Sequence, residues 1–517
     1  MGRRRYLRLC VPLHQQISPL DTWPVRDHAP EVIAGPDVVI NGCSHHWEDA
    51  YGGVDLTLSS LHRNSGRIFG RATLVRSGKQ RDTRTPLVDA ARGRVSRAIF
   101  SDTEIYEREQ ERIFRRCWLF VGHESSLPKP GDFITNYMGE DPVIVWRDAR
   151  GKVRVYLNTC PHRGNKLCLF DAGRTPTLVC SYHGWSFNSE GRLVGVPFLD
   201  RAYGGELDRA SNGLLEVPRV STYGGLIFAC LDDAPPALEE YLGDLRWYLD
   251  RLLFMESLGG LEVIPGCQKY VMAGNWKLVC ENFTGDAYHV ASSHASAMQV
   301  GVARGPVGQG RYGYFMAWLK PAHGLGWFLT DDSGYQADLR QAAQLGPEVV
   351  EYVTERYRRI QEGLRDVAAK PYGWIHGNCF PNFNLQGMNS ALRGHALALC
   401  HPRGPHESEM WQWCLIERAA PRVVKELAAR GLSRTQSGAG MVGVDDSENF
   451  ERIAENTRTP GSRGLTFNYT MGLGREGRWP GSEEWEIGGL PGLVGPEFWE
   501  TGQLHFYEHW ADLLALP

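Results

Sequence analysis

Cys160-Pro161-His162-Arg163-Gly164 and Cys180-Ser181-Tyr182-His183-Gly184 are the two stretches that decide the fold of this chain. Each stretch places one thiol and one imidazole close together, and 17 residues, 163 to 179, separate the first pair from the second. Thiolate sulfur and imidazole nitrogen are both ligands of transition metals. The two stretches therefore predict one metal centre with four protein ligands. These ligands are Cys160, His162, Cys180 and His183.

Two kinds of metal centre combine cysteine with histidine. A Rieske [2Fe–2S] cluster has two histidines in place of two cysteines on one of its irons, which raises its reduction potential. A structural zinc site also accepts both residue types, but its ligands more often come as C-x₂-C or H-x₃₋₅-H pairs. The pairs in this chain are C-x-H and C-x₂-H. Their spacing favours the iron–sulfur cluster over zinc.

The surroundings of the two stretches favour the same interpretation. Gly164 and Gly184 follow the ligands, and tight glycine-containing loops can present backbone N–H groups to cluster sulfur. Residues 152–157 alternate polar and apolar side chains, and residues 192–196 follow a second turn. Such alternation is typical of half-buried strands. We therefore expect the ligand pairs on two loops at the tips of β hairpins.

Length and composition bound the class of protein. A chain of 517 residues suggests two or more domains, and 42% hydrophobic with 22% charged residues is typical of globular proteins. The net charge of −4 gives no reason to expect nucleic acid or an anionic membrane as a partner. No apolar run approaches the ~18 residues that span a bilayer. Apart from Cys160 and Cys180, the other ten of the 12 cysteines show no paired framework, which fits a reducing cytosol and predicts a cytoplasmic protein.

The composition changes along the chain. Residues 1–86 are rich in Arg, Gly, Pro and Ser, so we expect a disordered or incidental extension, and Cys43-Ser44-His45-His46 within it has no partner pair. We expect an N-terminal helix at 87–117 that belongs to the C-terminal domain, the cluster domain at 118–232, and the C-terminal domain at 233–517.

Three local patterns predict elements outside the cluster segment. Ser101 and Glu104 fit a capping box at the start of a helix. Apolar residues between 349 and 364 recur at helical spacing and predict an amphipathic helix. Residues 383–416 are predicted to form several strands with turns at glycine.

A second motif carries further chemistry. In a helix, Asn282, Asp286 and His289 stand at i, i+4 and i+7 and share one face. His294 follows five residues after His289, so the helix must end or deform near residues 292–293 if both imidazoles bind one ion. Taken alone, this string is a moderate signal of a metal site, and a surface helix with two histidines is the less favoured alternative. After the cluster motif, it indicates a second metal site.

Two histidines suit non-haem Fe(II) when one carboxylate completes the facial triad and leaves positions open for oxygen. The candidate carboxylates are Asp445 and Asp446, which lie between the Gly-rich run 437–440 and a helix expected from Glu448 onward. An aspartate that caps this helix, followed by an acidic first turn, is the alternative interpretation.

From about Leu87 to Pro517, the chain resembles the α subunit of Rieske non-haem iron aromatic-ring-hydroxylating dioxygenases. Asn275-Trp276-Lys277, Asp286-x-Tyr288-His289-x₄-His294 and Asp445-Asp446-x-Glu448-Asn449 carry the resemblance together with the Cys/His pairs. The resemblance implies an α+β fold, with a β-sandwich-like Rieske [2Fe–2S] domain and a catalytic domain of mixed antiparallel sheet and helices that holds mononuclear Fe(II).

The resemblance also implies roles for individual residues. His289, His294 and Asp446 are expected to bind Fe(II), with Asp445 as the alternative carboxylate. Asn282 is expected to line the iron site. Asp286 is expected to bridge the Rieske histidine of one subunit and the iron of its neighbour. Aromatic pocket candidates, for which core packing is an equal explanation, are Tyr312, Tyr314, Phe315, Trp318, Leu325, Trp327, Phe328, Phe380, Phe383 and Leu385.

The implied activity is that of a terminal oxygenase. Both atoms of O₂ enter an aromatic ring, such as a polycyclic one, to give a cis-dihydrodiol, with electrons from NADH through a reductase and a ferredoxin. The implied assembly is a homotrimer, or α₃β₃ with a β subunit. The alternatives are a Rieske monooxygenase or O-/N-demethylase with the same irons, an electron-transfer protein with a vestigial second site, and a zinc-stabilised binding module.

Overall fold

The computed structural model describes residues 86–301, 314–330, 332–363, 372–387, 390–475, 490–496 and 498–516. These residues belong to one compact unit, Arg81–Pro517. The predicted N-terminal extension lies outside the described residues up to Thr85, including its Cys43-Ser44-His45-His46 string. The pocket candidate Tyr312 also lies outside them.

The N-terminal part of this unit is only partly helical, unlike the helix expected over 87–117. Strands β1 (Val88–Asp89) and β2 (Arg94–Ser96) form a small sheet with β21 (Thr466–Asn468). Short 3₁₀ turns η1 (Ala90–Arg92) and η2 (Arg97–Phe100) accompany them. The helix is α1 (Thr103–Glu109), which continues as the π-helical turn η3 (Gln110–Phe114).

The residue that caps α1 also differs from the predicted one. The carboxylate of Asp102 accepts hydrogen bonds from the backbone N–H groups of Glu104 and Ile105. The Ser101 hydroxyl instead donates to the carbonyl of Thr457, 3.3 Å away. Asp102 therefore takes the capping position, and Ser101 is used in a tertiary contact that the local pattern does not reveal.

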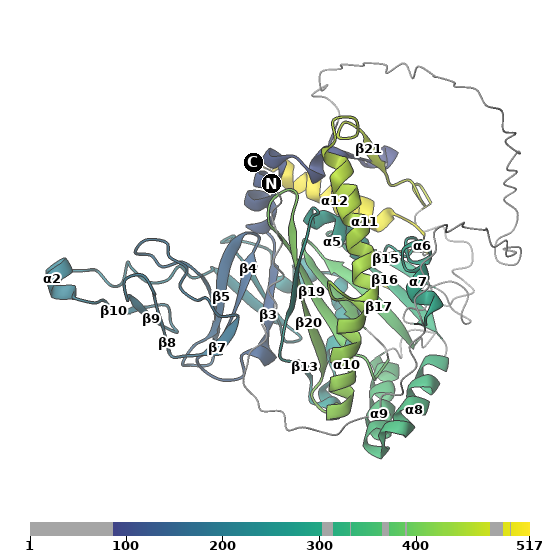
Figure 1. Cartoon of the computed structure of the whole chain (residues 1–517), viewed down its shortest axis with the longest axis horizontal. Coiled ribbons are helices and arrows are strands. Elements are labelled where there is room, and N and C mark those ends of the chain that lie inside the picture. Colours follow the sequence, from purple (N-terminus) through teal and green to yellow (C-terminus); the bar gives the residue numbers. More distant parts are fainter. Residues whose placement is uncertain are drawn as a thin grey trace, which may run out of the picture. The chain divides into compact units, whose positions relative to one another are not determined.

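The Rieske segment is built from antiparallel strands in three small sheets (Figure 1). A four-stranded sheet has the order β6 (Val153–Leu157), β5 (Asp141–Arg147), β4 (Asp132–Met138) and β7 (Ala172–Arg174). A second sheet contains β11 (Arg219–Tyr223), β12 (Leu226–Cys230) and β3 (Leu119–His123). A third contains β10 (Leu193–Gly195), β9 (Ser186–Asn188) and β8 (Thr177–Val179), and is followed by α2 (Leu199–Tyr203).

Both ligand loops were expected at the tips of β hairpins, and only the second loop lies at one. Cys180 to Trp185 connect β8 and β9, which pair with each other, so this loop closes a hairpin. Cys160 to Asn165 follow β6, whose sheet neighbour is β5, whereas β7 pairs with β4 on the other side. The first ligand loop therefore belongs to a crossover between strands rather than to a hairpin.

The catalytic segment is organised around one large antiparallel sheet. Its order is β13 (Leu261–Val263), β20 (Ser408–Glu417), β19 (His395–Pro402), β18 (Phe383–Gly387), β17 (Tyr372–Cys379), β16 (His323–Thr330), β15 (Tyr314–Leu319) and β22 (Leu493–Pro496). Strand β14 (Gln268–Met272) also pairs with β20. The strands predicted between 383 and 416 are thus confirmed as β18, β19 and the greater part of β20.

Helices accompany this sheet along the chain. They are α3 (Leu238–Leu242), α4 (Leu245–Leu253), α5 (Trp276–Phe283), α6 (Val290–Ser293), α7 (Ala295–Gln299), α8 (Ser333–Leu345), α9 (Pro347–Gly363), α10 (Arg422–Thr435), α11 (Met441–Arg458) and α12 (Thr501–Ala515). The amphipathic helix predicted between 349 and 364 is confirmed as α9, which buries Val349, Val353 and Ile360. No helix of the described residues has the length and apolar character that a membrane crossing requires.

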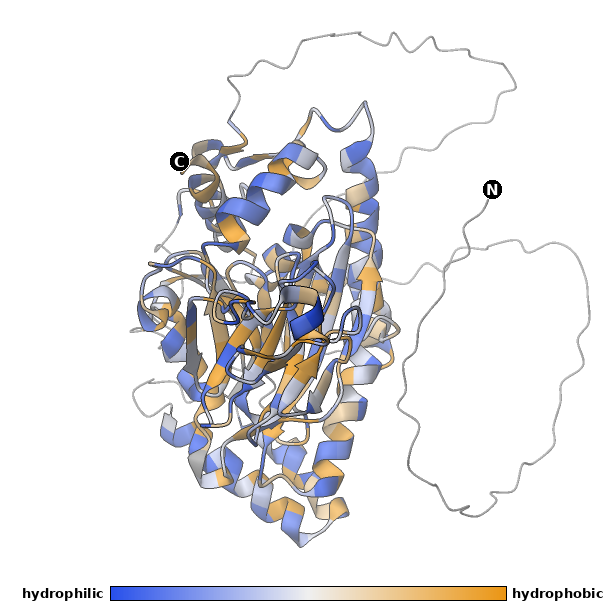
Figure 2. Cartoon of the chain, turned by 90° about the vertical axis from the view of Figure 1, so that its left-hand side faces the viewer, coloured by the Kyte–Doolittle hydropathy of each residue, from blue (hydrophilic) through white to orange (hydrophobic). Residues whose placement is uncertain are grey.

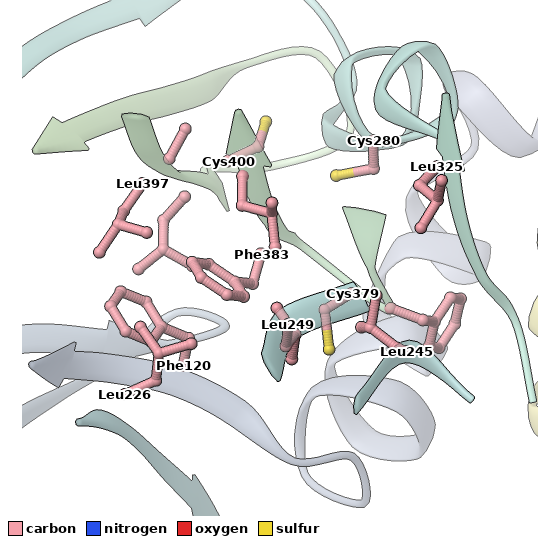
Figure 3. Packing of buried hydrophobic residues seen from close by; sticks show 14 of the residues in the cluster. Phe120, Leu226, Leu245, Leu249, Cys280, Leu325, Cys379, Phe383, Leu397 and Cys400 are labelled. Atoms are coloured by element: carbon pink, nitrogen blue, oxygen red, sulfur yellow. The ribbon is translucent and has the colours of Figure 1, made fainter. Parts of the chain in front are cut away.

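One hydrophobic core joins the Rieske and catalytic segments. Phe120 of β3 stacks on Phe383 of β18, with ring centroids 4.2 Å apart. Figure 3 shows both rings among Leu226 of the Rieske segment and Leu397 of the large sheet. The central strands are mostly hydrophobic in Figure 2, whereas the helices carry hydrophilic residues as well. This arrangement confirms the expected α+β class.

A buried carboxylate ties α1 to the helix that precedes the second metal motif. Glu109, the last residue of α1, accepts hydrogen bonds from Lys277 Nζ at 2.5 Å and from Trp276 Nε1 at 2.8 Å, both on α5. It also accepts one from Trp510 Nε1 of α12 at 2.9 Å. Glu109 and Lys277 are both completely buried. These bonds hold α5 in position because an isolated charge in the core would be costly.

Candidate metal centres

The two cysteine loops have the same backbone turn. The N–H groups of Gly164 and Gly184 donate to the carbonyls of Cys160 and Cys180, at 2.8 and 2.9 Å. Both glycines have positive φ, 68° and 73°, a conformation that glycine adopts without the strain caused by a Cβ atom. The histidine stands two residues after the cysteine in one loop and three in the other. The unequal spacing in the sequence therefore reflects two similar turns with different histidine positions.

The four ligand candidates come together between these loops. The Cys160 and Cys180 side chains are both buried, and the rings of His162 and His183 have centroids 4.5 Å apart. Burial raises the pKa of the Cys160 thiol. At Cys180 burial acts in the same direction, but hydrogen bonds, first those of the Tyr182 and His183 backbone N–H groups and then those of side chains, outweigh it and hold the pKa below its ordinary value. Amide donors aimed at sulfur suit a thiolate ligand.

His162 provides the test of whether a metal cluster fits. Its ring stacks on Trp185, with centroids 4.7 Å apart and planes 7° apart. Its Nδ1 atom is buried without a hydrogen-bond partner among the described protein atoms. Buried polar nitrogens normally have a partner, so this atom is available for a metal bond. Two buried thiols, two adjacent imidazoles and this nitrogen fit a Rieske cluster.

The second motif does not continue as one helix. α5 ends at Phe283, where the Thr284 hydroxyl donates to the carbonyl of Glu281 at 2.6 Å and Gly285 takes a φ of +126°. The expected common helical face of Asn282, Asp286 and His289 is therefore wrong beyond Asn282. The predicted break near residues 292–293 is confirmed, because α6 ends at Ser293. His289 and His294 flank this single helical turn.

Asp445 and Asp446 lie within a helix, unlike the loop position that we expected for them. α11 starts at Met441, directly after the Gly-rich run, so both aspartates belong to its second turn. The first turn of this helix packs closely against the preceding residues, since a Cβ on Gly443 would lie 2.7 Å from the Gln436 carbonyl oxygen. Asn449 Nδ2 of the same helix donates to Ser293 Oγ at 3.0 Å, which fixes α11 next to α6.

Three donor atoms converge between α6 and α11. Asp446 Oδ1 lies 3.4 Å from His289 Nε2 and 3.2 Å from His294 Nε2. One ligand atom from each of these residues lies within 4.8 Å of the others, which makes them a possible metal-binding group. Donors about 2.1 Å from one ion and at right angles to each other lie about 3 Å apart. The residues present thus fit a divalent ion with a 2-His-1-carboxylate donor set.

Each imidazole has a second carboxylate behind it. His294 Nδ1 lies 3.3 Å from Asp445 Oδ2, and His289 Nδ1 lies 3.3 Å from Asp286 Oδ1. Metal-binding histidines commonly give their other N–H to a carboxylate, which fixes the ring and its tautomer. Burial would lower the pKa of His289, but Asp286 and Asp446 outweigh it and raise that pKa to about 10. Such an excess of carboxylate favours a bound cation.

Asn282 and Asp286 lie beside the donor set. Asn282 Nδ2 is 3.3 Å from His289 Nδ1, and Asp286 Oδ1 accepts the backbone N–H of His289 at 3.2 Å. The Asp286 side chain is 31% exposed, and Tyr288 next to it is 61% exposed. Asp286 therefore contacts the His289 imidazole and is itself partly exposed.

Most of the described pocket candidates fall into two groups. Most belong to the main core, including Phe315, Leu325, Trp327, Phe380, Phe383 and Leu385. Phe328 instead packs with Ala287 and Met316 in a separate small cluster. Met316 Cε would lie 3.1 Å from a Cβ on Gly285, next to Asp286. Core packing therefore explains the first group, whereas Phe328 packs beside the metal motif.

The sequence interpretation missed two groups near the donor set. His376 of β17 is buried, which lowers its pKa to about 3 and keeps it neutral. His289, Asp286 and Asp446 all act on it electrostatically. Met316 was missed as well. Met316 and His376 stand on strands of the large sheet, far along the chain from the metal motif. No local sequence pattern marks them, because only the pairing of the strands brings them to the site.

Two families match the chain. The Rieske [2Fe-2S] domain matches residues 117–220, and the ring hydroxylating alpha subunit (catalytic domain) matches residues 238–516. Biphenyl 2,3-dioxygenase subunit alpha of Rhodococcus jostii (strain RHA1) is 36% identical over 449 residues, covering 83% of this chain and 91% of the relative. The large oxygenase component of the naphthalene 1,2-dioxygenase system of Pseudomonas aeruginosa is 36% identical over 422 residues, covering 79% and 89%.

Solved structures show the same relationship. Naphthalene 1,2-dioxygenase with indole bound in the active site superimposes with a TM-score of 0.72 at 31% identity, covering 83% of this chain and 94% of that chain. A quaternary ammonium Rieske monooxygenase, CntA, superimposes with a TM-score of 0.59 at 16% identity, covering 81% and 94%. The second likeness shows a shared fold alone.

Proposed function

The chain belongs to the family of aromatic ring-hydroxylating dioxygenase α subunits, and from this membership we propose that it adds both atoms of O₂ to an aromatic ring. The product is a cis-dihydrodiol. The observation that carries the proposal is the convergence of His289, His294 and Asp446 in a chain that also holds two Cys/His pairs. In this assignment Cys160 and Cys180 hold one iron of the cluster, and His162 and His183 hold the other.

The chain's own residues hold and orient both metal groups. When bound, the cluster supplies single electrons and the mononuclear Fe(II) supplies open coordination positions for oxygen. His289 and His294 present Nε2, and Asp446 presents Oδ1. Asp286 and Asp445 keep the Nδ1 side of each imidazole engaged, so that the rings are oriented before the metal binds.

The substrate side of the site is apolar. Ala287, Met316 and Phe328 form a buried cluster beside the donor set. The ring of Phe283 lies edge-on to that of His376, with ring centroids 6.2 Å apart. Such side chains hold a flat neutral ring and exclude water from it. The relatives act on biphenyl and naphthalene according to their names, and we assign an aromatic hydrocarbon to this chain.

Asp286 is the proposed route of electrons into the mononuclear site. It contacts His289 on one side and is partly exposed on the other. A partly exposed carboxylate can meet a cluster histidine of a second subunit, which suits a head-to-tail ring such as a homotrimer. The remaining partners of the proposal are an NADH-dependent reductase, a ferredoxin and a β subunit.

The decisive experiment is product analysis under ¹⁸O₂. The purified chain is supplied with NADH, a reductase, a ferredoxin and a panel of aromatic hydrocarbons. A cis-dihydrodiol with two ¹⁸O atoms is expected. A single labelled hydroxyl or released formaldehyde would instead identify a monooxygenase or demethylase. A colourless, zinc-containing protein would overturn the cluster assignment.

A further inference from the structure

Asn165 is a side chain that connects the two cysteine loops. It belongs to the first loop, where its backbone carbonyl accepts the N–H of Cys160 at 2.8 Å. Its side-chain Nδ2 reaches across to the second loop and lies 3.7 Å from Cys180 Sγ. Hydrogen bonds to sulfur are long because sulfur is large, so this distance lies within the range of such a bond. One residue thus contacts both cysteines of the proposed cluster.

The Asn165 amide has other acceptors as well. Nδ2 lies 3.1 Å from Ser181 Oγ and 3.2 Å from the carbonyl of Lys166. An amide group has two N–H bonds to share among these acceptors and the sulfur. A residue that merely ties the loops together would need the bond to Ser181 and not the bond to Cys180. The two functions can therefore be separated by substituting Ser181.

The Asn165 donor differs from the backbone donors around the cysteines. The amides of Tyr182 and His183 point to Cys180, and those of His162 and Arg163 to Cys160, as part of the loop turns themselves. They remain whatever side chains the loops carry. The side chain of Asn165 can be replaced without changing the carbonyl that Cys160 uses. Its contribution to the cluster can therefore be measured by itself.

We propose that the side-chain amide of Asn165 raises the reduction potential of the cluster through its hydrogen bond to Cys180 Sγ. The proposal rests on the assignment of Cys180 as a cluster ligand. Reduction adds one electron, so that one Fe(III) becomes Fe(II) and the sulfur atoms become more negative. A donor to sulfur stabilises this reduced form more than the oxidised form. Asn165 is a positioning residue that acts through Cys180.

The test is an equilibrium redox titration of the purified full-length chain. Dithionite supplies the electrons through soluble mediators, and visible absorbance and the EPR signal of the reduced cluster report the fraction reduced. Asn165→Leu keeps the size of the side chain and removes the donor. It should lower the equilibrium constant for reduction by about two- to tenfold, which is about 20 to 60 mV at 59 mV per tenfold.

Three further variants make the result specific. Asn165→Asp keeps the shape but places a negative charge beside the sulfur, so its potential should be lower than that of Asn165→Leu. Ser181→Ala removes the competing acceptor and should not lower the potential. Asn212→Leu is the matched control, because the Asn212 amide donates to the carbonyl of Asp208 and to Ser211 within its own turn. It should leave the potential unchanged.

Each outcome decides the proposal. Equal potentials for the unsubstituted chain and Asn165→Leu, both with full cluster content, would overturn it. Loss of the cluster from both Asn165 variants would show that the residue assembles the loops, and would overturn it too. Analysis of iron and acid-labile sulfide in the unsubstituted chain comes first. An absence of both there would refute the cluster assignment, and hence the proposed function, rather than the role of Asn165 within it.

Discussion

His294 Nδ1 lies 3.3 Å from Asp445 Oδ2. The neighbouring aspartate on α11 contacts the other nitrogen of the same ring, with Asp446 Oδ1 3.2 Å from Nε2. Two successive helical residues therefore engage opposite sides of one imidazole. We therefore propose different roles for the two residues: Asp446 as a metal ligand, and Asp445 as the group that orients His294.

We expect the two aspartates to differ in their effect on iron content. Asp446→Ala should abolish both iron binding at this site and oxygenation, because it removes a donor. Asp445→Ala should weaken Fe(II) binding by about 10- to 100-fold, the usual effect of losing the group behind a ligating histidine. Asp445→Asn keeps an acceptor, so its affinity for Fe(II) should lie between that of Asp445→Ala and that of the unsubstituted chain. Iron titration after chelation measures all three, and a greater loss for Asp445→Ala than for Asp446→Ala would reverse the assignment.

Asp286→Asn should uncouple the two metal centres without emptying them. The amide can still contact His289 but lacks the charge that holds its Nδ1 proton. Oxygenation in the presence of NADH, reductase and ferredoxin should fall strongly, while iron content and the visible spectrum of the cluster stay unchanged. His289→Ala is the comparison, because it should remove the mononuclear iron itself. Normal turnover in Asp286→Asn would argue against this residue as the electron route.

Lys277→Met should destabilise the chain by about 3–5 kcal/mol, because it leaves the buried carboxylate of Glu109 without its cation. The double variant Glu109→Gln with Lys277→Met should recover part of the loss. Arg422→Met is the control, since Arg422 is 92% exposed in its pair with Glu426 and such pairs contribute about 0–1 kcal/mol. Unfolding in urea measures these differences. Similar losses for the buried and the exposed pair would contradict the anchoring role.

Glu281 predicts a dependence of stability on pH. Loss of hydration raises its pKa to about 8, although Tyr469 and Tyr507 donate hydrogen bonds to it. The folded state therefore keeps a proton that the unfolded chain releases near pH 4.5. The contribution of this proton to the stability of the folded state is complete below pH 4.5 and is lost as the pH rises through about 8.

Glu281→Gln removes this titration while it keeps an oxygen for the two hydroxyls. As the pH increases from 5 to 9, the melting temperature of Glu281→Gln should therefore increase relative to that of the unsubstituted chain. The exposed Glu426→Gln on α10 should show no comparable trend. A difference between Glu281→Gln and the unsubstituted chain that is constant over this range would refute the raised pKa.

The sequence alone identified the chemistry because the ligands are local. Each cysteine stands two or three residues from its histidine, and this spacing favours a Rieske cluster over zinc. The resemblance to a known family then implied the second iron and the reaction, and the matches over most of the chain show that family. The iron roles of individual residues remain predictions that the experiments above address.

Only the tertiary structure decided which aspartate joins the donor set and what stands behind each imidazole. Asp445 and Asp446 are neighbours with the same side chain, and only the packing of α11 against α6 gives them different partners. The break after Phe283 depends likewise on the Thr284 hydroxyl and on Gly285 packing near Met316 and the Leu325 carbonyl. Local sequence thus indicated which kinds of metal centre to expect, because each motif brings its ligand types close together in the chain, whereas long-range packing decided which side-chain atoms converge.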